Sequence, residues 1–78
     1  MANSAGTDRE MQDATPADRD RIAQHITDGH AAQDAGDLGS AIDFYAAAKN
    51  VARYADMVAT RRAMQAVIDG LNTARRTR

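Results

Sequence analysis

The side chains that are able to do chemistry are few, and their spacing argues against catalysis. His25 and His30 are five residues apart, which places them about 140° apart around a helix axis, so they do not share one metal ion. The histidines of zinc proteases instead stand four residues apart with a glutamate between them. The chain has no cysteine, which excludes a thiolate metal site and a disulfide framework. We therefore expect no metal and no cofactor.

Two pairs of carboxylates stand close together, at Asp18 and Asp20 and at Asp34 and Asp37. Both pairs fall at the ends of expected helices, where acidic side chains cap free N–H groups or interact with the helix dipole. General acid–base catalysis would require a pocket that shifts the pKa of one carboxyl. A small helical chain with 4% aromatic residues offers little room for such a pocket. We expect that the protein is not an enzyme.

Arginine is the other charged residue type of interest, and the charges are unevenly distributed. Residues 1–40 carry eight acidic residues and three arginines, whereas residues 41–78 carry three acidic and seven basic residues. This separation favours attraction within the chain, or between two copies, over a nucleic-acid footprint. Arg61 and Arg62 lie on the flank of the last expected helix, where they either form a solvated face and pair with the acidic half or rim a binding surface that attracts an acidic partner.

The elements that position these residues follow from local sequence signals. Thr15 before Pro16 is typical of a helix start, because a capping hydroxyl precedes a proline in the first turn. Gly36 is typical of a helix end, and Asp37 is typical of the cap of the next helix. The third helix has apolar residues at three- and four-residue steps. We expect three antiparallel helices, over residues 16–35, 38–53 and 56–73.

Two features of this architecture are less directly encoded. Residues 1–14 carry almost no large apolar side chain, so we predict a disordered tail before a domain that spans residues 15–78. No proline or glycine lies between Ser40 and Ile68. A rival prediction therefore joins the second and third helices into one helix of about 35 residues.

The helical hairpin around Gly36 resembles a tetratricopeptide repeat, a helix–turn–helix unit of about 34 residues. The resemblance implies an all-α fold in which the hairpin packs closely and a third helix acts as the first half of an unfinished second repeat. It is carried by small residues and one aromatic at the spacing of that family, namely Gly29, Ala32, Gly36-Asp37, Ala41, Tyr45 and Ala48.

The same segment is also similar to the MIT domain, a module of three helices. Members of that family bind short helical or extended peptide motifs in grooves beside the third helix. The similarity implies an adaptor-like role in binding other proteins, and the two families stay open as alternatives. The matching residues are Ala31, Gly36-Asp37, Ala41-Ile42 and Tyr45, with looser agreement at Arg62, Ile68 and Ala74-Arg75.

We therefore predict a module that binds a helical or extended protein segment, or that associates with itself. The alternative is a small DNA-associated accessory protein that uses the Arg-rich third helix. No apolar run approaches the roughly 20 residues needed to span a bilayer, so we expect no membrane partner. The N-terminus lacks the apolar core of a signal peptide, so we expect a cytoplasmic location. The expected binding surface consists of Phe44, Val58, Arg61, Arg62, Met64, Ile68 and Leu71.

Overall fold

The computed structural model describes residues 2–77, and within this range the regular structure is entirely helical. The expected all-α class is therefore confirmed for the described residues, but with four helices in place of three. The helices are α1 (Ala2–Asp13), α2 (Pro16–Asp34), α3 (Leu38–Tyr54) and α4 (Val58–Arg76).

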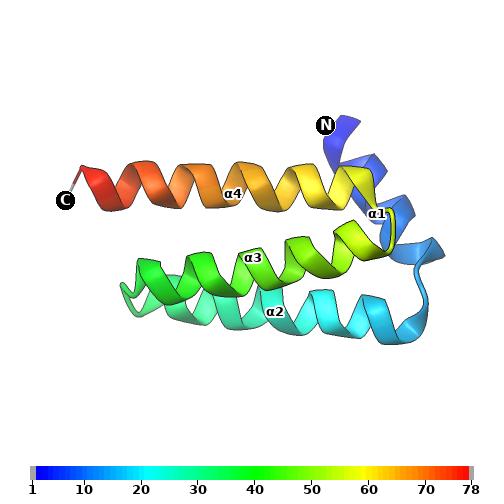
Figure 1. Cartoon of the computed structure of the whole chain (residues 1–78), viewed down its shortest axis with the longest axis horizontal. Helices are drawn as coiled ribbons and strands as arrows, with labels where there is room; N and C mark the ends of the chain where they lie inside the picture. Colours follow the sequence, from blue (N-terminus) through cyan, green and yellow to red (C-terminus); the bar gives the residue numbers. More distant parts are fainter. Residues whose placement is uncertain (1, 78) are drawn as a thin grey trace.

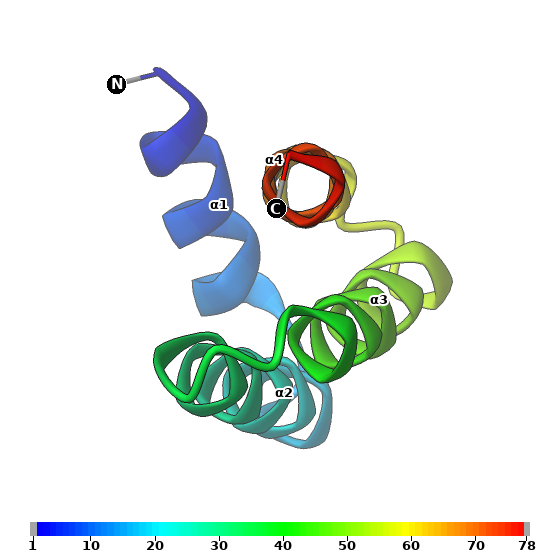
Figure 2. The same cartoon turned by 90° about the vertical axis from the view of Figure 1, so that its left-hand side faces the viewer.

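Helices α2, α3 and α4 correspond to the three expected helices and run antiparallel in sequence order (Figure 1). Helix α3 is central, because α2 packs along one side of it and α4 along the other (Figure 2). The rival prediction of one long helix is wrong, because the chain turns between α3 and α4 at Ala55, Asp56 and Met57. This turn folds α4 back onto α3.

The prediction of a disordered tail over residues 1–14 is wrong for the described residues, because Ala2–Asp13 form α1. This helix crosses the N-terminal end of α4 (Figure 1). Met1 lies outside the described residues. Helix α4 has no cap of its own, since its N-cap residue Met57 makes no side-chain cap bond. Glu10 of α1 replaces that cap: Ala59 N–H donates to Oε2 at 2.8 Å and Thr60 N–H donates to Oε1 at 2.6 Å. A carboxylate thus satisfies two free donors of a helix that is distant in sequence.

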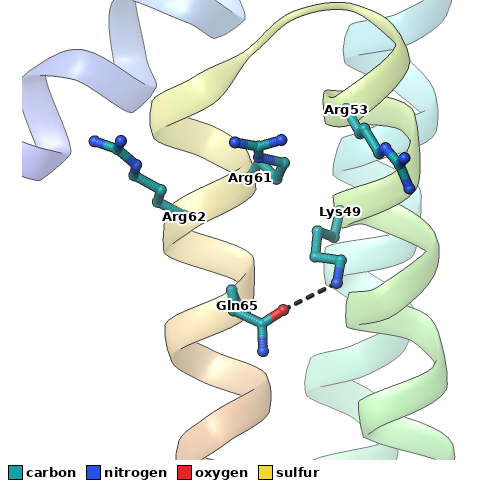
Figure 3. Close-up of a pocket in the computed structure, with 5 residues that line it drawn as sticks. All are labelled: Lys49, Arg53, Arg61, Arg62 and Gln65. Carbon is teal, nitrogen blue, oxygen red and sulfur yellow. Dashed lines mark hydrogen bonds between the residues drawn. The ribbon is translucent and has the colours of Figure 1, made fainter.

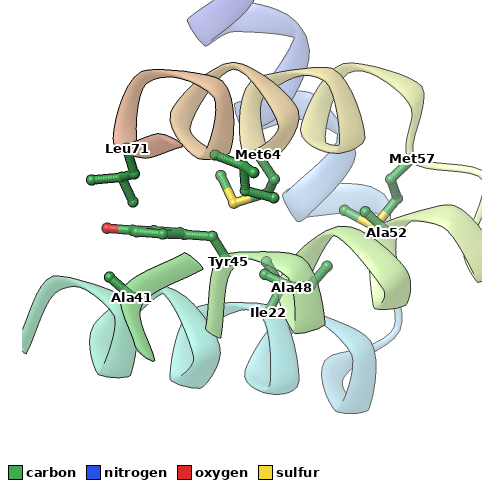
Figure 4. Packing of buried hydrophobic residues seen from close by; sticks show 9 residues of the cluster. Ile22, Ala41, Tyr45, Ala48, Ala52, Met57, Met64 and Leu71 are labelled. Atoms are coloured by element: carbon green, nitrogen blue, oxygen red, sulfur yellow. The ribbon is translucent and has the colours of Figure 1, made fainter. Parts of the chain in front are cut away.

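The core is centred on Tyr45 of α3, whose ring lies between α2 and α4 (Figure 4). A Cβ atom built on Gly29 of α2 would lie 2.9 Å from Cζ of this ring. His30 meets the ring edge to face at a centroid distance of 5.8 Å, and the Tyr45 hydroxyl donates to Oε1 of Gln33 at 3.3 Å. The other buried apolar residues are Ile22, Ala41, Ala48, Ala52, Met57, Met64, Ile68 and Leu71.

The contact between Gly29 and the ring of Tyr45 leads to a stability prediction. Gly29→Ala should lower the free energy of unfolding by about 1–3 kcal/mol, because the added methyl group overpacks the ring. Gly70→Ala is the matched control: it also lies in a helix, but its Cβ would meet no atom within 4 Å. That change should stabilise the protein by up to about 1 kcal/mol. Urea unfolding measures both, and a stabilised Gly29→Ala variant would contradict the contact.

The cap provided by Glu10 leads to a prediction about pH. Partial burial raises the pKa of its carboxyl, but the N–H donors of Thr60 and Ala59 outweigh this effect, so the pKa lies below its ordinary value. The buried Thr60 hydroxyl lies near the same carboxyl and also favours its charged form, which lowers the pKa of Glu10 further, although the hydroxyl oxygen has no hydrogen-bond partner. Because the folded-state pKa is lowered, the stabilisation is present above the ordinary value of 4.5 and is lost as the pH falls through the folded-state pKa.

Glu10→Gln should therefore lower the free energy of unfolding by about 1 kcal/mol at neutral pH, as loss of a helix cap does. The difference from the unmodified chain should shrink as the solution becomes more acidic than the ordinary pKa. Asp8→Asn is the matched control, because Asp8 is an exposed acidic residue of the same helix. A difference that is independent of pH would show that the cap does not depend on the charge of Glu10.

Candidate functional site

The most distinctive surface feature is a hollow of about 400 Å³ between α3 and α4. We call it the basic pocket. None of the lining residues within the described part of the chain is acidic. They are Lys49 and Arg53 of α3 and Arg61, Arg62 and Gln65 of α4 (Figure 3).

The register between α3 and α4 is what brings these side chains together. Lys49 Nζ donates to Oε1 of Gln65 at 2.9 Å, and Gln65 Nε2 donates to Oδ1 of Asp69 at 2.8 Å. Since the two helices are antiparallel, one turn forward along α3 and one turn back along α4 bring Arg53 level with Arg61. Figure 3 shows these two arginines on opposite helices beside the pocket, while Arg62 extends from the other side of α4. Arg53 and Arg61 therefore line the pocket from opposite helices at the same level.

A second hollow, of about 390 Å³, lies along α4 and has a different character. It is lined by Ala59, Arg62, Ala63 and Ala66, so its described lining is mostly methyl groups. Arg62 contributes to both hollows. This arginine therefore stands between a basic and an apolar part of the α4 surface.

The turn that sets this register has the geometry of a Schellman motif, in which two N–H groups after the helix satisfy two of its last carbonyls. Met57 N–H donates to the carbonyl of Ala52 at 2.8 Å, and Asp56 N–H donates to that of Arg53 at 3.3 Å. The turn between α2 and α3 repeats this pattern, with Gly36 at a φ of 79° where Asp56 has a φ of 57°. The second turn thus adopts a left-handed conformation without glycine.

This comparison predicts that glycine suits the second turn better than aspartate. Asp56→Gly should raise the free energy of unfolding by up to about 1 kcal/mol, because a side chain is disfavoured in the left-handed region. Thermal unfolding would measure the change. Gly36→Ala is the reciprocal control, since it introduces a Cβ at the equivalent position and should destabilise the protein. If Asp56→Gly lowers the melting temperature, the Asp56 side chain stabilises the turn in another way.

The seven residues expected from the sequence to form a binding surface divide into two groups. Arg61 and Arg62 are exposed and line the basic pocket, Val58 is 44% exposed, and Phe44 is half-buried. Whether these four bind a partner stays a prediction. The remaining three belong to the core and are covered by the protein itself: Met64, Ile68 and Leu71.

The burial of these three residues has a simple cause. Met64, Ile68 and Leu71 lie on the face of α4 that packs against α3 and covers Tyr45. Figure 4 shows Leu71 and Met64 facing the tyrosine ring. The apolar periodicity of α4 therefore indicates the core, whereas its exposed residues are mostly polar, small or charged and include Arg61, Arg62 and Asp69.

Sequence reasoning did not identify Lys49, Arg53 and Gln65 as members of the site. A signal for them existed, because Lys49–Arg53 and Arg61–Gln65 are both spaced by four residues and each pair therefore shares a helix face. Tyr54 was also missed, and it is 87% exposed directly after Arg53. An exposed tyrosine beside several arginines has the composition of a protein-binding surface.

Other types of site have little support in residues 2–77. No group of three or more His, Asp or Glu residues there could hold a metal ion, and none of the helices is long and apolar enough to cross a membrane. Comparisons with protein-family models, curated proteins and solved structures found no match. The resemblances to the tetratricopeptide repeat and the MIT domain therefore stay hypotheses.

Proposed function

We propose that the protein is a non-enzymatic interaction module that binds an acidic segment of another protein at the exposed face of α3 and α4. The basic pocket is the observation that supports this proposal. Three arginines and one lysine line it, and none of its described lining residues is acidic. Guanidinium groups bind carboxylates through two parallel hydrogen bonds, so a pocket of this composition suits Asp or Glu side chains.

Exposed apolar groups at the same end of the molecule extend this surface. Tyr54 ends α3 next to Arg53, and Val58 begins α4 one turn before Arg61 and Arg62. Tyr54 and Val58 are the two most exposed large apolar residues of the described chain. Tyrosine and arginine are enriched among residues that dominate binding energy at protein interfaces. The proposed partner segment therefore carries acidic residues together with at least one apolar residue.

The charge distribution also favours one orientation of binding. The acidic residues of the chain concentrate in its first half, which forms α1 and α2. An acidic partner is repelled from those helices and attracted to the pocket between α3 and α4, which steers its approach. A second copy of the chain is a competing partner, because its acidic helices have the charge that the pocket attracts.

DNA binding is the second candidate function, and the arginines at both ends of α4 favour it. Arg61 and Arg75 are fourteen residues apart, or about 20 Å along a helix. A protein that tracks phosphates loses affinity steeply as salt rises. Asp69 lies between these arginines on α4 and is exposed, which interrupts a continuous basic track. The protein-binding proposal is therefore better supported.

A displayed library of random peptides, selected on the full chain, tests the proposal. We predict that the selected peptides are enriched in Asp and Glu and include an apolar residue. The double variant Arg61→Gln/Arg62→Gln should lose binding to them by about tenfold or more, which corresponds to about 1.4 kcal/mol. Its thermal stability should change little, because both residues are exposed.

The matched control is Arg75→Gln/Arg76→Gln, which removes the same charge from the far end of α4. It should keep most of the binding. Equal losses in the two double variants would show that net charge, not the pocket, causes association. Tighter binding to duplex DNA than to any selected peptide, with steep salt dependence, would favour the second candidate function.

A further inference from the structure

Two arginines, Arg53 and Arg61, line the basic pocket from opposite helices. Arg53 comes from the last turn of α3 and Arg61 from the first turns of α4, at the same level of the antiparallel pair. Lys49 precedes Arg53 by four residues on the same helix face, a spacing at which like charges repel. No acidic residue lies among the described lining residues to compensate them. An anion held between the two helices would relieve this repulsion.

We propose that the basic pocket binds the phosphate group of a phosphorylated side chain on the partner segment. Arg53 and Arg61 would hold the phosphoryl oxygens from opposite helices, and Lys49 would contact the group from one turn away. This inference rests on the proposed function and specifies the chemistry of its ligand. It makes association depend on modification of the partner.

The number of cationic donors favours a phosphate over a single carboxylate. A phosphate monoester carries a charge of about −1.5 to −2 and presents three acceptor oxygens. Lys49 and Arg53 line the pocket from α3, and Arg61 lines it from α4. In Figure 3 the Lys49 ammonium points toward α4, whereas the Arg53 guanidinium points away from it, so Arg53 has to turn toward α4 to contact the ligand. A single planar carboxylate matches one guanidinium fork, whereas a tetrahedral phosphate can accept from several donors. Three cationic side chains from two helices thus match the phosphate better.

The remaining contacts of the pocket are consistent with this assignment. Gln65 holds the Lys49 ammonium by one hydrogen bond and is itself held by Asp69. The ammonium has three N–H groups, so two stay available to a ligand. The N–H groups of Ala59 and Thr60 are already occupied by Glu10. An anion in the basic pocket would therefore be held by side chains and not by those two N–H groups.

Two short synthetic peptides of Glu and Ala, identical except for a central phosphoserine or serine, provide the test. Each is titrated into the ¹⁵N-labelled full chain, with inorganic phosphate and inorganic sulfate as reference anions. We expect the phosphopeptide to bind about tenfold or more tightly than the serine peptide. The side-chain Nε–Hε signals of Arg53 and Arg61 should shift with it, and the double variant Arg53→Gln/Arg61→Gln should lose this preference. The variant Arg75→Gln/Arg76→Gln, which lies outside the pocket, should retain it.

The possible outcomes separate this inference from the proposed function. If both peptides bind with equal affinity and the double variant Arg53→Gln/Arg61→Gln binds neither, the pocket binds acidic segments and the phosphate assignment is wrong. If phosphate and sulfate shift the same signals as strongly as the phosphopeptide does, the pocket holds an adventitious ion only and the assignment is also wrong. If neither peptide binds while selected acidic peptides do, the segment binds outside this pocket. Preferential binding of single-stranded RNA or DNA over the phosphopeptide would overturn the assignment in favour of nucleic acid.

Discussion

The contact between the ring of Tyr45 and the backbone of Gly29 is the constraint on which the other packing depends. Among the buried apolar residues of the described chain, Tyr45 supplies the one aromatic ring, and this ring fits only because α2 has no side chain at Gly29. Met64 and Leu71 of α4 then cover the ring from the other side. The position of α4 against α3 is fixed as a result. Since this register also decides which polar residues face each other, the core determines the composition of the basic pocket.

The carboxylate of Glu10 performs a comparable role at the edge of the fold. It accepts hydrogen bonds from two backbone N–H groups at the start of α4 and thereby attaches α1 to the rest of the molecule. Helix α1 has few apolar side chains of its own. One acidic residue of the N-terminal half is thus used by the fold itself. The basic side chains of the pocket have no comparable acid among their described neighbours. The uneven charge distribution of the sequence therefore leaves its positive excess at the surface between α3 and α4.

The sequence predicts the parts of this structure that are encoded by local signals. Thr15 and Pro16 mark the start of α2, and Gly36 marks its end, so these boundaries could be placed within a few residues. Helix α1 was missed because a count of apolar residues does not detect a carboxylate that caps a distant helix. The second turn was ambiguous because Asp56, not glycine, adopts the left-handed conformation. Arg61 and Arg62 were identified as candidates, but their neighbours Lys49 and Arg53 were not, because the register between two helices is not a local property.

The same packing constrains how a partner can be recognised. Covering Tyr45 requires the large apolar residues of α4, so little apolar surface is left on this helix beyond Val58 and the alanines of the second hollow. A partner that binds this face must gain much of its affinity from charged groups. Exposed charges act over roughly 8–10 Å at moderate salt, and they raise the rate of association more than the lifetime of the complex. The proposed binding would therefore be fast and reversible, and a change of charge on the partner would be an effective way to control it.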